Sequence, residues 1–432
     1  MFKQLGISNT EVAFYTSWLT LPWVIKPLWS PFVDLIKTKR WWLLLTQILL
    51  GAGLAGVGLS LHATSFFRWS LALLFLLAFS SATHDISIDG FYMLGLDEGE
   101  QSLFVGIRNT AYRIAMIAGQ GGLLMLVGLF ENMFDSTVRA WSIGFMIAGA
   151  LMILLWIYHS YILPHPVADC STAVSGRNIL KEFGMTFLSY FKKPHIIPAL
   201  LFILLFSFPE AQLTKIAPLF LVDSAAEGGL ALTTSQLGFS QGTLGVIGLL
   251  LGGILGGLTL SRFGLRKCIW YMVAAISVPD LVYVYLSWLP TQNMAVVSTC
   301  IFIEQMGYGF GFTAYTLFLM YFARGEHQTS HYAISNGIMP LGMMLPGMIS
   351  GILQEHMGYR TFFIWVIACC AVTCIVSAII KYEPDGLIYS YDFNKAKWIE
   401  DINLCQIFLG RMEVETITKE QANQWILNHP IN

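Results

Sequence analysis

The class of this protein is decided by one stretch, residues 246–267, which reads VIGLLLGGILGGLTLSRFGLRK. An apolar, glycine-rich run long enough to help span a bilayer as a helix is closed by a basic cluster, as at the cytoplasmic end of a membrane span. The rest of the 432-residue chain agrees, since 56% of it is hydrophobic and 12% charged, against roughly 25% charged in a soluble domain. This composition excludes a water-soluble enzyme and predicts a polytopic membrane protein.

Similar apolar runs recur along the whole chain and are long enough to be helices that cross a membrane. They are apolar on all sides, whereas the strands of a membrane barrel would alternate with polar residues. We therefore predict an all-α polytopic membrane protein with eleven spans, at about 11–33, 41–61, 69–93, 103–129, 139–160, 196–221, 236–260, 267–289, 294–322, 331–354 and 361–380.

The longest polar loop divides these spans into two groups. We expect an N-terminal bundle of five helices (1–160), a cytoplasmic central loop (161–195), a C-terminal bundle of six helices (196–381) and a cytoplasmic tail (382–432), partly helical around 418–428. The loop lysines and arginines place the N-terminus outside and the C-terminus in the cytoplasm. The net charge of −2 and the absence of a long basic run exclude nucleic acid as a partner, and the seven cysteines form no metal-ligand pattern.

Ionisable side chains at membrane depth are costly and usually functional. The candidates are Lys26, Asp85, Asp89, Arg108, Arg113, Glu210, Lys215, Asp280 and Glu304. Asp85 and Asp89 are four apart and so share a helix face, and Lys26, between two prolines, is expected to pair with Asp85 or to receive a substrate carboxylate. Two structural alternatives stay open: a gate or anchoring pair formed by Asp89 and Arg108, and a simple helix cap for Asp280, which follows Pro279.

The basic cluster of the opening stretch resembles the loop signature of the major facilitator superfamily, Gly-x-x-x-Asp-Arg-x-Gly-x-Arg. The matching residues are Gly257, Arg262, Gly264 and Arg266, with Ser261 in place of the aspartate, and Asp34 marks a degenerate copy in the first half. Glycine at the first motif position is expected to let two helices approach closely. Asp34 lies 32 residues nearer to the start of its half than Ser261 does, so we expect a two-bundle architecture of twelve helices whose first helix is missing from this sequence. A true eleven-helix protein stays open.

Four segments in order resemble the AmpG-type muropeptide permeases, a branch shared with acetyl-CoA transporters: LPWVIKPLWSP at 21–31, SATHDISIDG at 81–90, YRIAM at 112–116 and YAIS at 332–335. The resemblance implies a secondary transporter that imports anhydromuramyl-peptide solutes with protons across the bacterial inner membrane. It makes Lys26 and Arg113 suited to carboxylate recognition and Asp85 or Asp89 suited to proton coupling. His84 stands where the family usually has glutamine.

We therefore assign candidate roles to the charged and aromatic residues. The proton-coupling candidates are Asp85, Asp89 and Glu304, and the substrate-binding candidates are Lys26, Arg108, Arg113, Tyr112, Glu210 and Lys215. We expect no catalytic residue, metal or cofactor, and as partners a small solute, protons and the lipid bilayer, with the chain monomeric. Three alternatives remain: a superfamily transporter of another sugar, peptide or anionic solute; a membrane sensor or scaffold acting through the tail; and a nonfunctional fragment. A membrane enzyme is disfavoured because His84 and Asp85, as helix neighbours, point about 100° apart.

Overall fold

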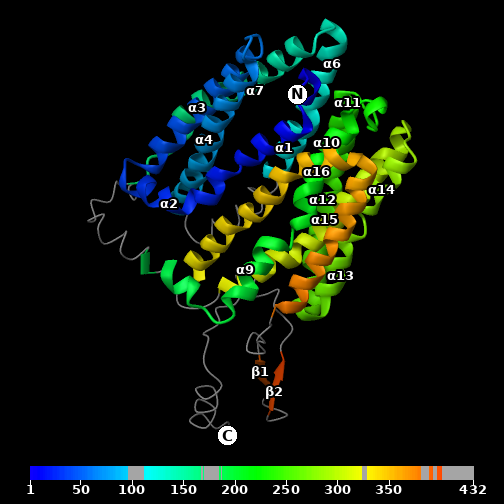
Figure 1. Ribbon diagram of the computed structural model, residues 1–432. Coiled ribbons are helices and arrows are strands. Elements are labelled where there is room, and N and C mark those ends of the chain that lie inside the picture. Colours follow the sequence, from blue (N-terminus) through cyan, green and yellow to red (C-terminus); the bar gives the residue numbers. More distant parts are fainter. Residues whose placement is uncertain are drawn as a thin grey trace.

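The computed structural model describes residues 1–95, 111–166, 169, 184–185, 187–323, 328–380, 389–392 and 397–400, and of these the side chains of residues 31, 32, 34, 35, 93, 95, 328–330, 389–392 and 397–400 are left aside. Arg108, most of the 161–195 loop and most of the tail lie outside these residues. Up to residue 380 the described regular structure is helical (Figure 1), which confirms the all-α prediction for the membrane part.

The first half of the chain supplies the helices that run from blue to cyan in Figure 1. They are η1 (Lys3–Leu5), α1 (Asn9–Trp18), α2 (Leu21–Leu35), α3 (Lys39–Ser60), α4 (Phe66–Gly95), the π-helical turn η2 (Ile117–Leu123), α6 (Leu124–Phe134) and α7 (Thr137–Ile162).

The second half supplies the helices that run from green to orange. They are α9 (Ile196–Leu205), α10 (Phe208–Val222), η3 (Ala225–Glu227), α11 (Thr234–Leu237), the π-helical turn η4 (Gly238–Gly245), α12 (Val246–Phe263), α13 (Leu265–Ser277), α14 (Leu281–Trp288), α15 (Met294–Ala323) and α16 (Gln328–Ile379).

Side-chain caps fix where several helices begin. The hydroxyls of Ser8, Thr38 and Ser136 accept hydrogen bonds from backbone N–H groups in the first turns of α1, α3 and α7. Such a cap satisfies one of the N–H groups that a helix leaves without an intrahelical partner. These caps lie in the polar segments outside the predicted apolar runs, so the hydropathy pattern and the capping residues agree on where these helices begin.

Breaks inside predicted spans are the main difference from the sequence analysis. The run expected at 11–33 is two helices, α1 and α2, with a break between them. Pro22 lies in the first turn of α2 and has no backbone N–H to donate to the preceding turn, so one helix cannot continue through it undisturbed. The spans expected at 196–221 and 267–289 are also divided, near Ser207 and Asp280. The runs expected at 331–354 and 361–380 are two helices that share the label α16, and they are separated by a kink at Gly358, whose φ of 71° and ψ of 164° are not helical.

Eight helices of the described residues are long and apolar enough to cross a membrane, and the longest of them, His331–Ile379, contains the Gly358 bend. Neither α1, with 10 residues, nor α2, with 15, reaches spanning length alone. The number of eleven spans thus stays a prediction, as do the domain boundaries.

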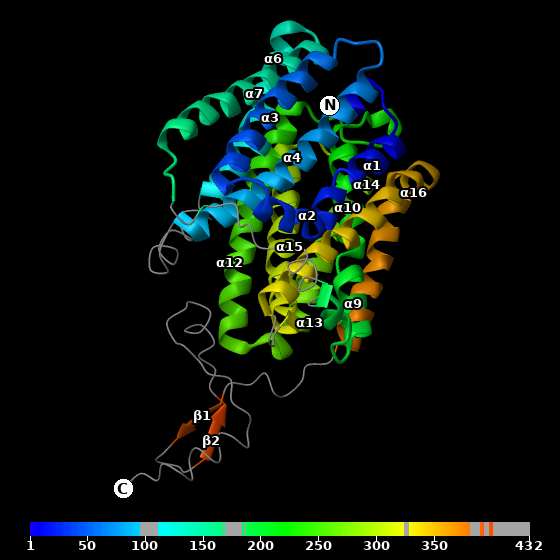
Figure 2. The ribbon, with the colours of Figure 1, turned by 90° about the vertical axis from the view of Figure 1, so that its left-hand side faces the viewer.

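The two halves meet along two seams. In the first, α1 and α2 run beside the first part of α16, and in the second, η2 and α6 pack against α11 and η4 (Figures 1 and 2). The second seam has no room for a side chain at position 121, since a Cβ atom on Gly121 would overlap Thr243 and Gly242. Glycine is the residue that lets two backbones approach this closely.

The glycines of α12 pack on one face only. A Cβ on Gly248 would lie 2.6 Å from the carbonyl oxygen of Phe302 on α15, and Gly256 is crowded in the same way by Phe310. Gly257 has nothing within 4 Å of its Cβ position. The expectation that Gly257 brings two helices together is therefore wrong, because the packed face lies one residue earlier.

Two buried apolar clusters fill the second half. One contains the side chains around Leu213, Tyr283, Ile301 and Phe363, and the other those around Phe206, Ile276 and Tyr315. On α9–α10, α13–α14 and α15, the first cluster lies toward one end of each helix and the second toward the other end. The residues between them therefore form a middle layer that both clusters shield from water.

The described part of the tail is a short antiparallel hairpin of β1 (Tyr389–Asp392) and β2 (Lys397–Glu400). Tyr389 pairs with Glu400, and Asp392 with Lys397. The helix expected around 418–428 lies outside the described residues.

Candidate functional site

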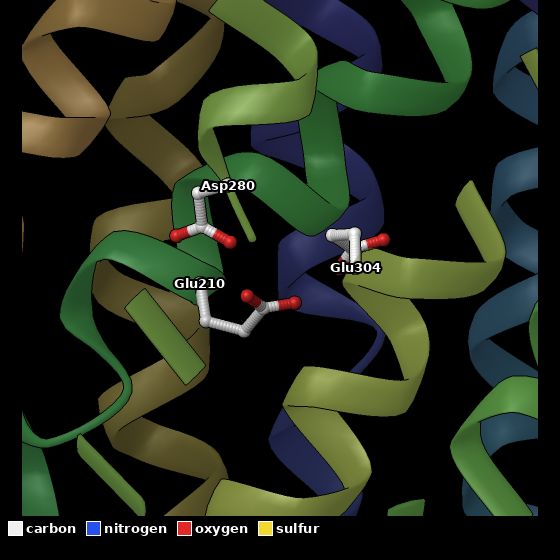
Figure 3. A group of neighbouring side chains, drawn as sticks. All are labelled: Glu210, Asp280 and Glu304. Carbon is white, nitrogen blue, oxygen red and sulfur yellow. The ribbon is translucent and has the colours of Figure 1, made fainter. Parts of the chain in front are cut away.

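Three carboxylates meet in the middle layer of the second half (Figure 3). Glu210 lies in the first turn of α10, Asp280 is the residue before α14, and Glu304 is on α15. All three are at most 3% exposed, and an oxygen of each lies within 4.8 Å of an oxygen of the others. Chain breaks create this meeting, because the interruptions before α10 and α14 place Glu210 and Asp280 at helix N-termini, where the helix dipole favours negative charge.

The neighbours of this carboxylate cluster satisfy part of its hydrogen-bonding capacity. Glu304 accepts hydrogen bonds from Gln305 Nε2 at 3.1 Å and from the Tyr283 hydroxyl at 3.4 Å. The Thr214 hydroxyl donates to Glu210 Oε1 at 3.1 Å. One oxygen each of Glu210 and Asp280 is buried without a hydrogen-bond partner, which is uncommon for a buried polar atom.

The cluster cannot carry three negative charges. Like charges a few ångströms apart disfavour ionisation, and burial disfavours it further. No lysine or arginine of the described residues forms an ion pair with Glu210, Asp280 or Glu304. A bound cation must therefore neutralise part of the charge, and a proton is the smallest that can do so.

Within the part of the chain that the structure describes, these three side chains are also the group close enough to hold a metal ion. Their donors are all oxygens, the ligands that hard cations take. The arrangement can thus exchange protons or bind a small cation, and transport experiments separate the two.

A second charged site lies in the first half, where α2 and α4 face each other. Lys26 Nζ is 2.5 Å from Asp85 Oδ2, and the side chains are 25% and 47% exposed. His84, the next residue on α4, turns toward α3, where its Nδ1 lies 2.9 Å from the Thr46 hydroxyl. The structure thus pairs Lys26 with Asp85 and directs His84 elsewhere.

Lys215 lies at the seam between the halves. Its Nζ donates to the hydroxyl of Thr16 on α1 at 3.3 Å, and its stem runs past Gly347 on α16. Among the described residues no carboxylate lies within ion-pair distance of it. Lys215 and Glu210 share α10 but contact different groups, so the structure separates these two candidates.

The remaining candidates are spread over the chain. Tyr112 and Arg113 are exposed side chains before η2, Asp89 lies one turn beyond Asp85 on α4, and Arg108 is outside the described residues. In the loop motif, Gly264 has φ 75° and separates α12 from α13, a conformation that glycine adopts without strain. Arg262 and Arg266 beside it are exposed, and the side chain of Asp34 is not described.

Sequence reasoning placed Asp280 at membrane depth but gave neither Asp280 nor the neighbouring Tyr283 a functional role. Asp280 was expected to be a possible cap, but its side chain makes no cap hydrogen bond and faces the other carboxylates. Tyr283, one turn further along, was not a candidate. The sequence pattern that could have indicated this site is the Pro279-Asp280 pair inside an apolar run. A buried acid at a helix break that does not cap the helix needs another group to hydrogen-bond or to neutralise it.

The family follows from comparison with known sequences. The model of the Major Facilitator Superfamily matches residues 1–345. The chain belongs to this superfamily. It is therefore a multi-pass membrane transporter of small solutes, and not an enzyme.

Relatives and solved structures agree with this assignment. The Anhydromuropeptide permease of Escherichia coli strain K12 is 24% identical over 351 residues, 80% of this chain and 68% of the permease. The "Putative transporter AmpG 4" of Rickettsia conorii is 24% identical over 373 residues, covering 83% and 86%. The nucleoside transporter NupG, at 17% identity, has a TM-score of 0.65 over 89% of this chain and 93% of its own. A D-xylose–proton symporter, at 10% identity, also reaches 0.65 over 89% and 91%.

Proposed function

We propose that this transporter imports muropeptide-like solutes across a bacterial inner membrane and couples the import to protons at Glu210, Asp280 and Glu304. The observation that carries the coupling is the buried carboxylate cluster with its two unpartnered oxygens. A cluster that must hold a neutralising cation, placed between two water-excluding clusters, loads and releases that cation only when the protein changes its conformation. This dependence is what links a proton to the movement of cargo.

The charged groups of the first half and of the seam suit the cargo. An anhydromuramyl peptide carries carboxylates, amides and sugar hydroxyls, and lysine binds a carboxylate as a compact point charge. Lys215 has no acidic partner among the described residues, and the part-exposed Lys26–Asp85 pair can exchange its internal partner for a carboxylate of the solute. The likeness to relatives named as muropeptide permeases supports this cargo class.

Uptake of radiolabelled anhydromuramyl tripeptide into proteoliposomes tests the proposal. An inward proton gradient should drive accumulation, and a protonophore should abolish it. Glu304→Gln should lose gradient-driven accumulation but keep exchange of solute across the membrane, because exchange needs no net proton movement. Asp135→Asn, an exposed acid outside the cluster, is the matched control and should behave as the wild type.

Each part of the proposal can fail separately. Equilibration that ignores the proton gradient and is unaltered by Glu304→Gln or Asp85→Asn refutes proton coupling. Accumulation driven by a sodium gradient without a pH difference assigns the cluster to a metal cation instead. Gradient-driven uptake of another anionic sugar or peptide, with none of the tripeptide, overturns only the cargo.

A further inference from the structure

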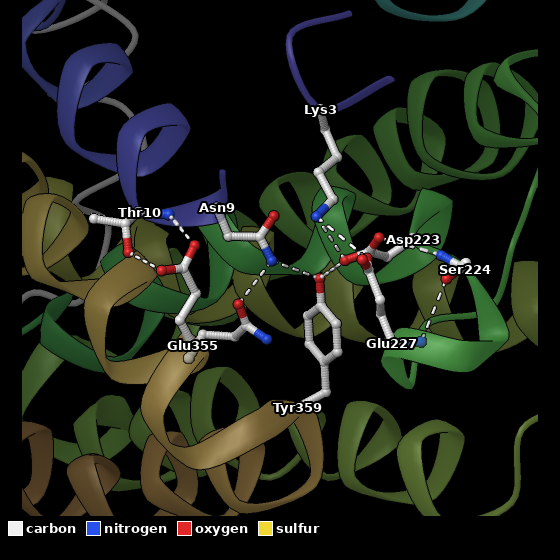
Figure 4. Close-up of polar contacts among 9 residues, drawn as sticks. Lys3, Asn9, Thr10, Asp223, Ser224, Glu227, Glu355 and Tyr359 are labelled. Carbon is white, nitrogen blue, oxygen red and sulfur yellow. Dashed lines mark hydrogen bonds and ion pairs between the residues drawn. The ribbon is translucent and has the colours of Figure 1, made fainter. Parts of the chain in front are cut away.

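A polar cluster ties the two halves together at the end of the molecule where the N-terminus lies (Figure 4). We define this latch by its members: Lys3, Asn9 and Thr10 from the first half, and Asp223, Glu227, Gln354, Glu355 and Tyr359 from the second. It spans the loop after α10, the start of α1 and the bend of α16.

Tyr359 lies at the centre of the latch. Its hydroxyl donates to Asp223 Oδ2 at 2.7 Å and accepts from Asn9 Nδ2 at 2.9 Å, so one oxygen joins two groups of the second half to one of the first. The same Asn9 nitrogen donates to Gln354 Oε1 at 2.7 Å. Gly358, with its positive φ, bends α16 directly before Tyr359 and thereby places this hydroxyl.

Two charged contacts flank this centre. Lys3 Nζ lies 3.0 Å from Asp223 Oδ2, with the aspartate side chain only 6% exposed. On the other side, Glu355 accepts from the backbone N–H of Thr10 at 2.9 Å and from its hydroxyl at 2.6 Å. Glu355 therefore caps the N-terminus of α1 from the opposite half, where the helix dipole favours an anion.

The second seam is joined at the same end of the molecule. Gln4 Nε2 donates to the Thr234 hydroxyl at 2.7 Å, and that hydroxyl donates to Glu131 Oε2 on α6. The short η1 segment thus contacts both seams, one through Lys3 and the other through Gln4. A movement that opens this end must break contacts in both.

The pKa values of two acids in the latch are shifted in opposite directions. Burial alone would raise the pKa of Asp223, but hydrogen bonds with Glu227 and Tyr359 outweigh it, and Lys3 adds both a hydrogen bond and its charge. The net result is a pKa of Asp223 below the usual value. The hydrogen bond with Asp223, and then the charge of Asp223, raise the pKa of Glu227.

We propose that this latch is the gate that keeps the N-terminal end of the transporter closed, with the Tyr359 hydroxyl as the contact that must break before solute can enter from that side. A transporter that alternates between two conformations needs contacts present in one and absent in the other. The contacts of Asn9 with Gln354 and Tyr359 cross between the halves and are buried, whereas those of Thr10 with Glu355 cross at the surface. All of them use groups that water can hydrogen-bond once the halves part.

The gate is tested with a reporter cysteine at Ser17. This side chain is buried on α1 without a hydrogen-bond partner, beside Gly347 of α16 and about 12 Å inward from Asn9 along the helix. In Ser17→Cys protein, labelling by a membrane-impermeant maleimide is measured in spheroplasts and in inverted vesicles. The chain without the new cysteine gives the background, and the two preparations identify the side of the membrane.

Tyr359→Phe removes only the hydroxyl and keeps the ring against Phe220 and Phe363. It should speed labelling from the N-terminal side by about two- to tenfold, the effect of losing the neutral hydrogen bond that Asn9 of the first half donates to the Tyr359 hydroxyl. Lys3→Gln, which removes the charge facing Asp223 across the halves but keeps a side chain that can donate a hydrogen bond, should act in the same direction. Tyr285→Phe, at an exposed position, is the control and should change nothing.

A locked form completes the test. Cysteines placed at Thr10 and Glu355 and joined by a short bifunctional thiol reagent should suppress the labelling that Tyr359→Phe permits. The proposal is overturned if neither Tyr359→Phe nor Lys3→Gln changes labelling in either preparation, or if the locked form labels as fast as the unlocked one. Because no solute is used, this outcome is independent of the cargo and of proton coupling.

Discussion

Asp280→Asn should make the stability of the protein less sensitive to alkaline pH. The substitution keeps the shape of the side chain and removes one of three acids from the carboxylate cluster. The nearest oxygens of the three side chains lie within 4.8 Å of one another, and at that upper limit two ionised carboxylates repel by about 3.5 kcal/mol at an effective dielectric constant of about 20. Raising the pH forces this repulsion on the folded protein, while the unfolded chain separates the charges, so stability is lost as pH rises.

Thermal unfolding of detergent-solubilised protein at pH 6 and pH 9 measures the effect. The wild type should lose more stability between the two values than Asp280→Asn, by up to about 3 kcal/mol. Asp135→Asn, which removes an exposed acid, should follow the wild type. Parallel loss in the wild type and in Asp280→Asn would refute the inference that the three side chains share one neutralising cation.

Three further outcomes are expected. Gly248→Ala should destabilise the protein relative to Gly257→Ala by about 1–3 kcal/mol, because only the first new methyl group meets the backbone of α15, and thermal unfolding compares the two. Lys26→Met and Asp85→Asn should each lower solute uptake at least tenfold but change stability by less than about 1 kcal/mol, since the pair is partly exposed. A loss of folded protein instead would assign the pair a structural role. Because the pKa of Asp223 is lowered in the closed gate, its contribution is present above the usual aspartate range and is lost only as pH falls below it. The ratio of reporter labelling in Tyr359→Phe to labelling with Tyr359 intact, compared at the same pH so that the thiolate fraction cancels, should therefore be unchanged between about pH 7 and pH 5. A ratio that already falls toward one at about pH 6 would contradict this.

The fold followed from the sequence as far as local composition decides it. Apolar runs predict helices in lipid because every backbone polar group must be satisfied within the segment. Hydropathy does not locate breaks such as those near Ser207 and Asp280, where the chain stays apolar on both sides. It is these breaks that determine which charged side chains meet.

The candidate site was predictable one residue at a time but not as an arrangement. Lys26 and Glu304 stood out because each is an ionisable group in an apolar run. The carboxylate cluster combines three helices, and no spacing along the sequence reports that proximity. The latch was harder still, because Lys3 and Asp223 occur in polar segments at the ends of helices, where a charge is ordinary.

The ion pair between Lys26 and Asp85 has a consequence for how the chain enters the membrane. A lysine at the centre of a span costs about 2.5–3.5 kcal/mol on insertion scales, and its partner follows 59 residues later. At about 5–20 residues per second of synthesis, α2 waits roughly 3–12 s for α4. During that interval the unpaired charge of Lys26 makes the transfer of α2 alone into lipid unfavourable. The two helices should therefore leave the insertion machinery together.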